Sequence, residues 1–170
     1  MRVLVIDPDP ARAALVAEGL EGIKPLEVRQ AAIFDEREVA EFAPDVVVIA
    51  SDSPDRDTLE SLREASHNNP RPVVMFVDRS EPGLAEQAVR AGVAAYIVDG
   101  LAPSRVRPIL DVAMSRFALT QQLRGDLAKA KADLESRKTV ERAKGLLMKE
   151  RGLDEDGACL LYTSPSPRDS

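Results

Sequence analysis

Cysteine, histidine and tryptophan are scarce in this 170-residue sequence, which has one cysteine, one histidine and no tryptophan. A lone cysteine, Cys159, excludes an internal disulfide, and one cysteine with one histidine cannot form a zinc site or a catalytic triad. His67 is expected to be a solvated residue at a helix end rather than a ligand or a base. No glycine-rich phosphate-binding loop occurs either. The sequence therefore offers no constellation typical of an enzyme.

Long apolar runs are also missing. No run approaches the roughly 20 residues that span a bilayer, and the start, Met1–Asp7, is too short and too soon acidic for a signal peptide. The net charge of −6 favours solubility and argues against general coating of nucleic acid. We therefore expect a cytoplasmic protein without a membrane-spanning segment.

Five short apolar runs alternate with segments whose apolar residues recur at helical spacing. Three of the runs are continuously apolar, which is typical of parallel strands buried on both faces. The alternation predicts an α/β domain of the flavodoxin-like type over residues 1–115, with a doubly wound, five-stranded parallel sheet. The predicted strands are Val3–Ile6, Leu26–Val28, Val46–Ile49, Val73–Val77 and Ala94–Val98, and the predicted helices are Ala11–Leu20, Glu36–Phe42, Asp55–Ser66 and Gly83–Ala91.

A different pattern follows this domain. Leu123, Leu127, Ala130 and Leu134 are spaced four, three and four residues apart, which is the spacing of a heptad seam. We expect residues 116–136 to be a coiled-coil linker helix that pairs with a second copy of the chain. The alternative is one long helix that packs back on its own domain.

The segment from residue 137 to 151 is basic, although the protein as a whole is acidic. It holds six Lys/Arg against two Glu, whereas residues 1–136 carry 16 basic and 23 acidic residues. A concentrated positive surface suits a polyanion such as nucleic acid; the alternative is a solvated helix face. The candidate RNA-binding residues are Arg137, Lys138, Arg142, Lys144, Lys149 and Arg151.

The run Glu141–Met148 resembles the opening helix of the ANTAR domain, an RNA-binding antitermination module. Residues 1–118 resemble response-regulator receivers, and several stretches are most similar to those of nitrate-regulatory antiterminators. These stretches are Ser51–Glu60, Val74–Asp78, Tyr96–Gly100 and Asp111–Phe117.

The resemblance implies a signal-responsive transcription antitermination regulator of two-component signalling. Such a protein would be a homodimer through its coiled coil and could receive its signal from a separate sensor protein. It would bind hairpin RNA in nascent mRNA if its ANTAR domain is complete, whereas the 170-residue form is expected to bind RNA poorly or not at all. The alternative is a dimerising protein-interaction adaptor that does not bind nucleic acid. A DNA-binding response regulator is a third reading, but no second short helix of a helix-turn-helix is indicated.

The sequence departs from the receiver pattern where receivers carry their chemistry. By resemblance, paired acids after the first strand hold Mg²⁺, an aspartate ending the third strand accepts phosphate, and a Ser/Thr and a Lys contact that phosphate. Ala50 stands at the phosphoacceptor position, with Asp52 as a weak substitute, and Val77 and Asp99 stand at the Ser/Thr and Lys positions. Asp7 and Asp9 could retain weak affinity for Mg²⁺, and no other cofactor is expected. The domain is thus predicted to be a pseudo-receiver.

The last residues do not continue the helical pattern that precedes them. Two prolines and several Ser/Thr residues occupy 159–170, and we interpret this stretch as a non-native, adapter-like tail, the alternative being a natural disordered terminus. Residues 137–158 would then be the N-terminal part of an ANTAR domain, a domain that by resemblance continues with two further helices.

Overall fold

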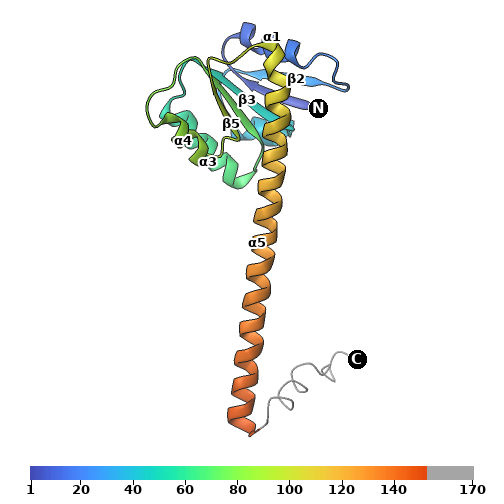
Figure 1. The fold of residues 1–170 in the computed structure, drawn as a ribbon, viewed down its shortest axis with the longest axis vertical. Coiled ribbons are helices and arrows are strands. Elements are labelled where there is room, and N and C mark those ends of the chain that lie inside the picture. Colours follow the sequence, from blue (N-terminus) through green and yellow to red (C-terminus); the bar gives the residue numbers. More distant parts are fainter. Residues whose placement is uncertain (153–170) are drawn as a thin grey trace. The chain divides into compact units, whose positions relative to one another are not determined.

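The computed structural model describes residues 1–152, which form a five-stranded parallel sheet with helices on both faces and then a long helix (Figure 1). The sheet order is β2-β1-β3-β4-β5, as expected for a doubly wound α/β fold, so the predicted fold class is confirmed. The strands are β1 (Arg2–Ile6), β2 (Glu27–Ala31), β3 (Val46–Ser51), β4 (Val73–Val77) and β5 (Ala95–Val98), and the helices are α1 (Pro10–Gly19), α2 (Glu36–Phe42), α3 (Arg56–Asn68), α4 (Leu84–Arg90) and α5 (Pro103–Arg151).

The chain divides into two compact units, residues 1–120 and 121–170, and α5 contributes to both. The predicted boundaries after residues 115 and 136 fall inside this continuous helix and remain predictions. The predicted tail, 159–170, and the end of the predicted 137–158 segment lie outside the described residues. Within residues 1–152, no helix combines the length and the apolar character needed to cross a bilayer.

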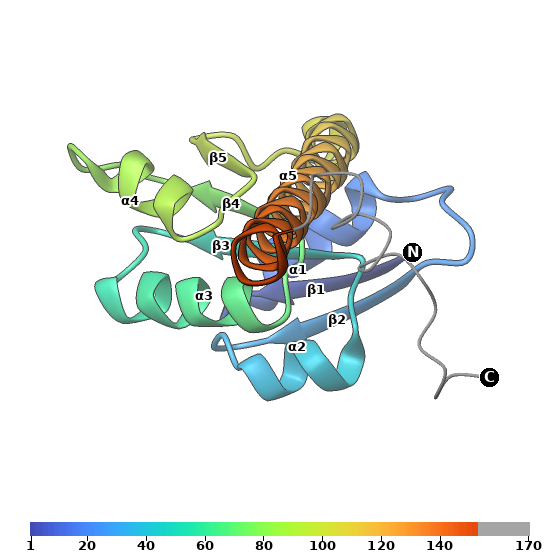
Figure 2. The ribbon, with the colours of Figure 1, turned by 90° about the horizontal axis from the view of Figure 1, so that it is seen from below.

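The three central strands are buried on both faces, as their continuous apolar sequences predict. Alternate residues point to opposite sides, so the sheet separates two apolar clusters. Leu4 and Met75 belong to the cluster that α2, α3 and α4 cover, whereas Val5 and Phe76 belong to the cluster covered by α1 and the first turns of α5. Figure 2 shows these helices on either side of the sheet.

The edge strand β2 differs from its prediction, which placed it at Leu26–Val28. It extends to Ala31 because Glu27, Arg29 and Gln30 pair in register with β1 despite their polar side chains. Because one face of an edge strand is solvated, the length of an apolar run does not give the length of such a strand. The Arg29 guanidinium lies 4.2 Å from the centre of the Phe42 ring, and this cation–π contact helps α2 to pack over a polar strand.

Three helices of the sheet domain begin at an aspartate whose side chain caps the first turn. Asp9 accepts a hydrogen bond from the Ala11 amide (2.9 Å), Asp35 from the Arg37 amide (2.8 Å), and Asp55 from the Thr58 amide (2.7 Å). Such caps give a hydrogen-bond acceptor to backbone amides that otherwise lack one. The negative carboxylate also interacts favourably with the positive end of the helix dipole. The caps thus fix where α1, α2 and α3 start.

Close packing between α1 and α5 generates a stability prediction at Gly19. A Cβ atom there would lie 2.5 Å from the Pro103 carbonyl oxygen and 2.7 Å from the Val106 Cβ. We expect Gly19→Ala to lower the free energy of unfolding by about 2 kcal/mol, because the backbone at Pro103 cannot move away from the added methyl group. Gly125→Ala is the matched control, since nothing lies within 4 Å of its Cβ position. Chemical denaturation measures both, and an unchanged Gly19→Ala midpoint would contradict the packing described.

Candidate functional site

Four aspartates surround one arginine at the edge of the sheet where β1, β3 and β4 end. Asp7 and Asp9 follow β1, while Asp52 follows β3 and Asp78 follows β4. Ligands and chemistry collect at this edge in doubly wound folds. Arg12, from the first turns of α1, reaches all four carboxylates. We call these five residues the Arg12 cluster.

The contacts of Arg12 are short to three of the four carboxylates. Its Nε atom lies 2.8 Å from Asp7 Oδ2 and 4.0 Å from Asp9 Oδ2. Its Nη1 atom lies 2.9 Å from Asp52 Oδ1 and 3.3 Å from Asp78 Oδ2. One guanidinium therefore links the loops that follow three different strands.

Asp7 is the most enclosed member, with a side chain that is 0% exposed. Burial raises the pKa of Asp7 above its usual value, while the hydrogen bond from the Asp9 amide and the charge of Arg12 act in the opposite direction. The Nε–Oδ2 pair is not aligned as a hydrogen bond despite its short separation, so the attraction to Arg12 is mainly one of charge. Without Arg12, the buried carboxylate of Asp7 would lose its counter-charge.

Asp52, the predicted substitute acceptor, is bound to Arg12 rather than free. The hydrogen bond from Arg12 lowers the pKa of Asp52, and the same bond raises the pKa of Arg12. The side chain is 76% exposed and directly follows β3, because this strand extends to Ser51 instead of ending at the predicted Ile49.

Asp9, predicted to share weak Mg²⁺ affinity with Asp7, has a different local role. Its Oδ1 atom caps α1, and its Oδ2 atom faces Arg12 at 4.0 Å. Mg²⁺ requires several oxygen ligands in near-octahedral geometry, but here Arg12 lies at the Asp7 oxygen that such an ion would use. Among residues 1–152, no three Asp, Glu, His or Cys side chains are arranged to hold a metal. As arranged, these residues do not fit a magnesium site.

The remaining predicted receiver positions are apolar or turned to solvent. Ala50 and Val77 are 3% and 2% exposed, and they lie on the adjacent strands β3 and β4. Asp99 follows β5 in a left-handed conformation (φ 47°), and its amide donates to the Val77 carbonyl at 2.8 Å. In the described part of the chain, the Asp99 side chain forms no ion pair with the Arg12 cluster.

Arg12 and Asp78 are the site residues that sequence reasoning missed. A charge imbalance in the sequence pointed to both residues. Aspartates that follow three neighbouring strands meet at one end of the sheet, and a cation is needed near them. Arg12 follows Asp9 by three residues, a spacing that places both on one side of the first helical turn. This imbalance, together with the helical spacing, could have identified it.

The basic residues 137–151 lie on the last turns of α5. Arg137, Lys138, Arg142 and Lys149 are exposed, Lys144 is half-buried, and Arg151 is the last residue of the helix. Lys138, Arg142 and Lys149 share one side of the helix because they are spaced four and seven residues apart. Leu146 is also exposed (59%), whereas Val140 and Leu147 are half-buried. The described residues thus present a cationic helix face to solvent.

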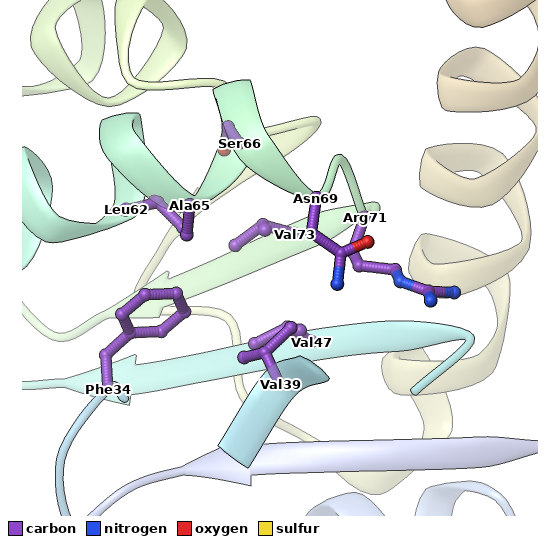
Figure 3. Close-up of a pocket in the computed structure, with 9 residues that line it drawn as sticks. All are labelled: Phe34, Val39, Val47, Leu62, Ala65, Ser66, Asn69, Arg71 and Val73. Atoms are coloured by element: carbon purple, nitrogen blue, oxygen red, sulfur yellow. The ribbon is translucent and has the colours of Figure 1, made fainter. Parts of the chain in front are cut away.

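One shallow pocket lies between α2, α3 and the sheet, with Phe34, Val39 and Leu62 among its apolar lining residues (Figure 3). It has space of about 10 Å³, which is room for roughly one water molecule. Its polar lining residues are Ser66, Asn69 and Arg71. The space is too small for a ligand larger than a water molecule.

Comparison with known proteins adds two independent findings. A family model for the ANTAR domain matches residues 128–161, which include the basic segment. The receiver fold is supported by the crystal structure of a CheY-like response regulator receiver domain protein from Methanospirillum hungatei. Its TM-score is 0.56 at 20% identity, over 70% of this chain and 97% of that one. At this identity the likeness concerns the fold alone.

Two curated proteins resemble the chain over most of its length. The transcriptional regulatory protein PdtaR of Mycobacterium tuberculosis is 36% identical over 128 residues, 73% of this chain and 62% of that protein. The transcriptional activator protein ExaE of Pseudomonas putida is 29% identical over 126 residues, 72% of this chain and 59% of that protein. The chain therefore spans about three fifths of the length of these relatives.

The Arg12 cluster predicts a pH-dependent loss of stability in Arg12→Gln. At pH 7 this change leaves the buried Asp7 carboxylate uncompensated, at an expected cost of about 3 kcal/mol in the free energy of unfolding. Losing the positive charge raises the pKa of Asp7 further, so the folded state binds a proton more readily than the unfolded state. The cost should be small while Asp7 is protonated at acid pH and should grow as pH rises through that pKa.

Urea denaturation of Arg12→Gln at pH 4 and pH 7 measures this dependence. Arg63→Gln, at an exposed arginine on α3, is the matched control and should cost at most about 0.5 kcal/mol at either pH. An equal cost for Arg12→Gln at both pH values would show that Arg12 does not compensate Asp7.

Proposed function

We propose that this chain, a response regulator that joins a receiver domain to an ANTAR domain, controls transcription by antitermination through contact with hairpin RNA. The observation that carries the proposal is the ANTAR match at residues 128–161, because it coincides with the exposed cationic face of α5. Lysine and arginine on one helix face suit the phosphate backbone of RNA, whose electrostatic attraction supplies much of the affinity. Regulation, rather than catalysis, is the role proposed.

The receiver domain, in this proposal, does not act by accepting a phosphoryl group. The methyl group of Ala50 has no atom that can be phosphorylated, and Val77 offers no hydroxyl to a phosphate. Arg12 further occupies the oxygen atoms of Asp7 and Asp52. The receiver domain would instead be controlled by a separate sensor protein or by a change in dimerisation.

The apolar seam on α5 supports dimerisation with a second copy. Leu123, Leu127 and Leu134 are 59%, 56% and 53% exposed, and Ala130 is exposed between them. Leucines at heptad spacing are stable in water chiefly when a partner helix covers them. Two copies would bring two basic segments to one RNA element.

A second candidate function is a dimerising adaptor that binds protein instead of RNA. Leu146 favours it, because this leucine is 59% exposed among the basic residues and could anchor a protein partner. The RNA measurement below separates the two functions.

Incubation with Mg²⁺ and acetyl phosphate tests the pseudo-receiver. We expect the intact mass to stay unchanged, because the acceptor position lacks a carboxylate, while a receiver with an aspartate there gains a phosphate under the same conditions. Asp52→Asn gives the site-specific comparison. A phosphate adduct in the parent chain that disappears in Asp52→Asn would mean that Asp52 does substitute as the acceptor.

RNA binding is tested by fluorescence anisotropy with a paired-hairpin RNA over a range of salt concentrations. Arg142→Gln with Lys149→Gln should weaken binding and reduce the slope of log K against log salt by about 1.4, from about 0.7 per lost charge. Arg56→Gln with Arg63→Gln removes the same charge from exposed sites on α3 and should change neither quantity. Equal effects of the two pairs would favour the adaptor.

A further inference from the structure

In the Arg12 cluster, four carboxylates share a single guanidinium. Arg12 lies within 3.3 Å of Asp7, Asp52 and Asp78 and at 4.0 Å from Asp9. An arginine in an ion pair often binds one carboxylate through two parallel hydrogen bonds, but here the guanidinium is spread over segments that follow three strands. A cation surrounded by carboxylates from several loops is the arrangement in which proteins hold a divalent metal ion.

Two of these carboxylates are placed by the backbone and not by the guanidinium. The Asp78 amide donates to the Ser51 carbonyl at 3.2 Å, and the Arg79 amide donates to the Asp52 carbonyl at 3.0 Å. These hydrogen bonds continue the pairing of β3 with β4 beyond the ends of both strands. Asp52 and Asp78 would therefore stay side by side if the guanidinium were removed.

Asp7 indicates independently that a cation is required at this place. Its Oδ1 atom accepts a hydrogen bond from the Asp9 amide at 2.7 Å, whereas its Oδ2 atom is buried and has no hydrogen-bond partner among residues 1–152. A buried carboxylate oxygen without a hydrogen bond needs a nearby positive charge. In the described part of the chain that charge is Arg12, whose Nε atom lies 2.8 Å away.

We infer that Arg12 is a tethered replacement for a divalent cation, which holds the segments after β1, β3 and β4 together at any metal concentration. The guanidinium and a metal ion would compete for the same oxygen of Asp7. Removal of the guanidinium alone would uncover a site for a cation that prefers oxygen ligands. This inference deepens the proposal that the receiver domain lacks phosphoryl chemistry, and it rests on that proposal.

Ca²⁺ is a suitable probe of the uncovered site, because it accepts flexible geometry whereas Mg²⁺ demands a near-ideal octahedron. The side chains of Asp52 and Asp78 are 76% and 60% exposed, so both can turn towards an ion beside Asp7. In the parent chain an ion must first displace Arg12. If Arg12 leaves the site less than about a tenth of the time, the parent binds Ca²⁺ at least about tenfold more weakly than a chain without this side chain.

Isothermal titration with Ca²⁺ compares the parent chain with Arg12→Gln, and we expect the dissociation constant of the variant to be lower by at least about tenfold. Urea denaturation followed by circular dichroism is the second measurement. Excess Ca²⁺ should raise the denaturation midpoint of Arg12→Gln and leave the parent midpoint unchanged, because an ion that binds only the folded state stabilises it. Equal responses of the two chains would overturn the inference.

Two further variants identify the ligands. Arg63→Gln removes the same charge from an exposed position on α3 and should bind Ca²⁺ no more tightly than the parent. Arg12→Gln combined with Asp7→Asn also removes the buried charge, so it should lose the gain in affinity and should fold without an ion. A double variant that keeps the gain would place the ion elsewhere and contradict the inference.

The same measurements remain decisive if Arg12→Gln is unfolded in the absence of metal. Ca²⁺ should then restore the helix content of the parent, and a failure to do so overturns the tethered cation. The acetyl phosphate experiment separates this inference from the proposal on which it rests. A parent chain phosphorylated on Asp52 contradicts both. A parent chain that stays unphosphorylated while Arg12→Gln does not respond to Ca²⁺ contradicts the tethered cation alone.

Discussion

The sheet domain depends on one guanidinium that neutralises a carboxylate with no access to water. Asp7 directly follows strand β1, and its burial is tolerable because Arg12 is close by. The same side chain reaches Asp52 and Asp78, so the segments after β1, β3 and β4 share a single counter-ion. In place of a cavity ready for an ion and a phosphate, the sheet edge contains an internal network of ion pairs. That network is the physical reason for proposing a receiver fold without receiver chemistry.

The side chains of α5 change in character twice along its length. Near its start, Val106, Leu110 and Ala113 are fully or almost fully buried against the sheet. Further along, the leucines of the seam are more than half exposed. Beyond the seam the sequence changes again, to exposed lysine and arginine. Along this one helix, residues buried against the sheet are thus followed by exposed leucines and then by exposed cations. Association and contact with RNA are the roles proposed for the second and third stretches.

The sequence was sufficient to predict those parts of the fold that depend on apolar pattern. Strands β1, β3 and β4 are continuously apolar and were located to within a residue or two, and the parallel α/β class followed from their alternation with helices. Strand β2 was misplaced because its pairing depends on backbone hydrogen bonds to β1 and not on its polar side chains. The candidate site was predicted less well. That Ala50 and Val77 lack phosphate-binding groups can be read directly from the sequence. The contact between Arg12 and Asp52 joins residues 40 positions apart, so it is apparent only in the folded sheet.

The start of α3 responds to acidity, because its first turn is capped by the charged side chain of Asp55. A serine or threonine cap would be indifferent to acidity, but a carboxylate loses its charge on protonation. At α3 the hydrogen bonds from Thr58 lower the pKa of Asp55, so that cap contributes fully above the ordinary aspartate range and weakens as pH falls through the lowered value. The first turn of α3 would thus loosen only at a pH below the ordinary aspartate range, where the capping carboxylate of Asp55 takes up a proton.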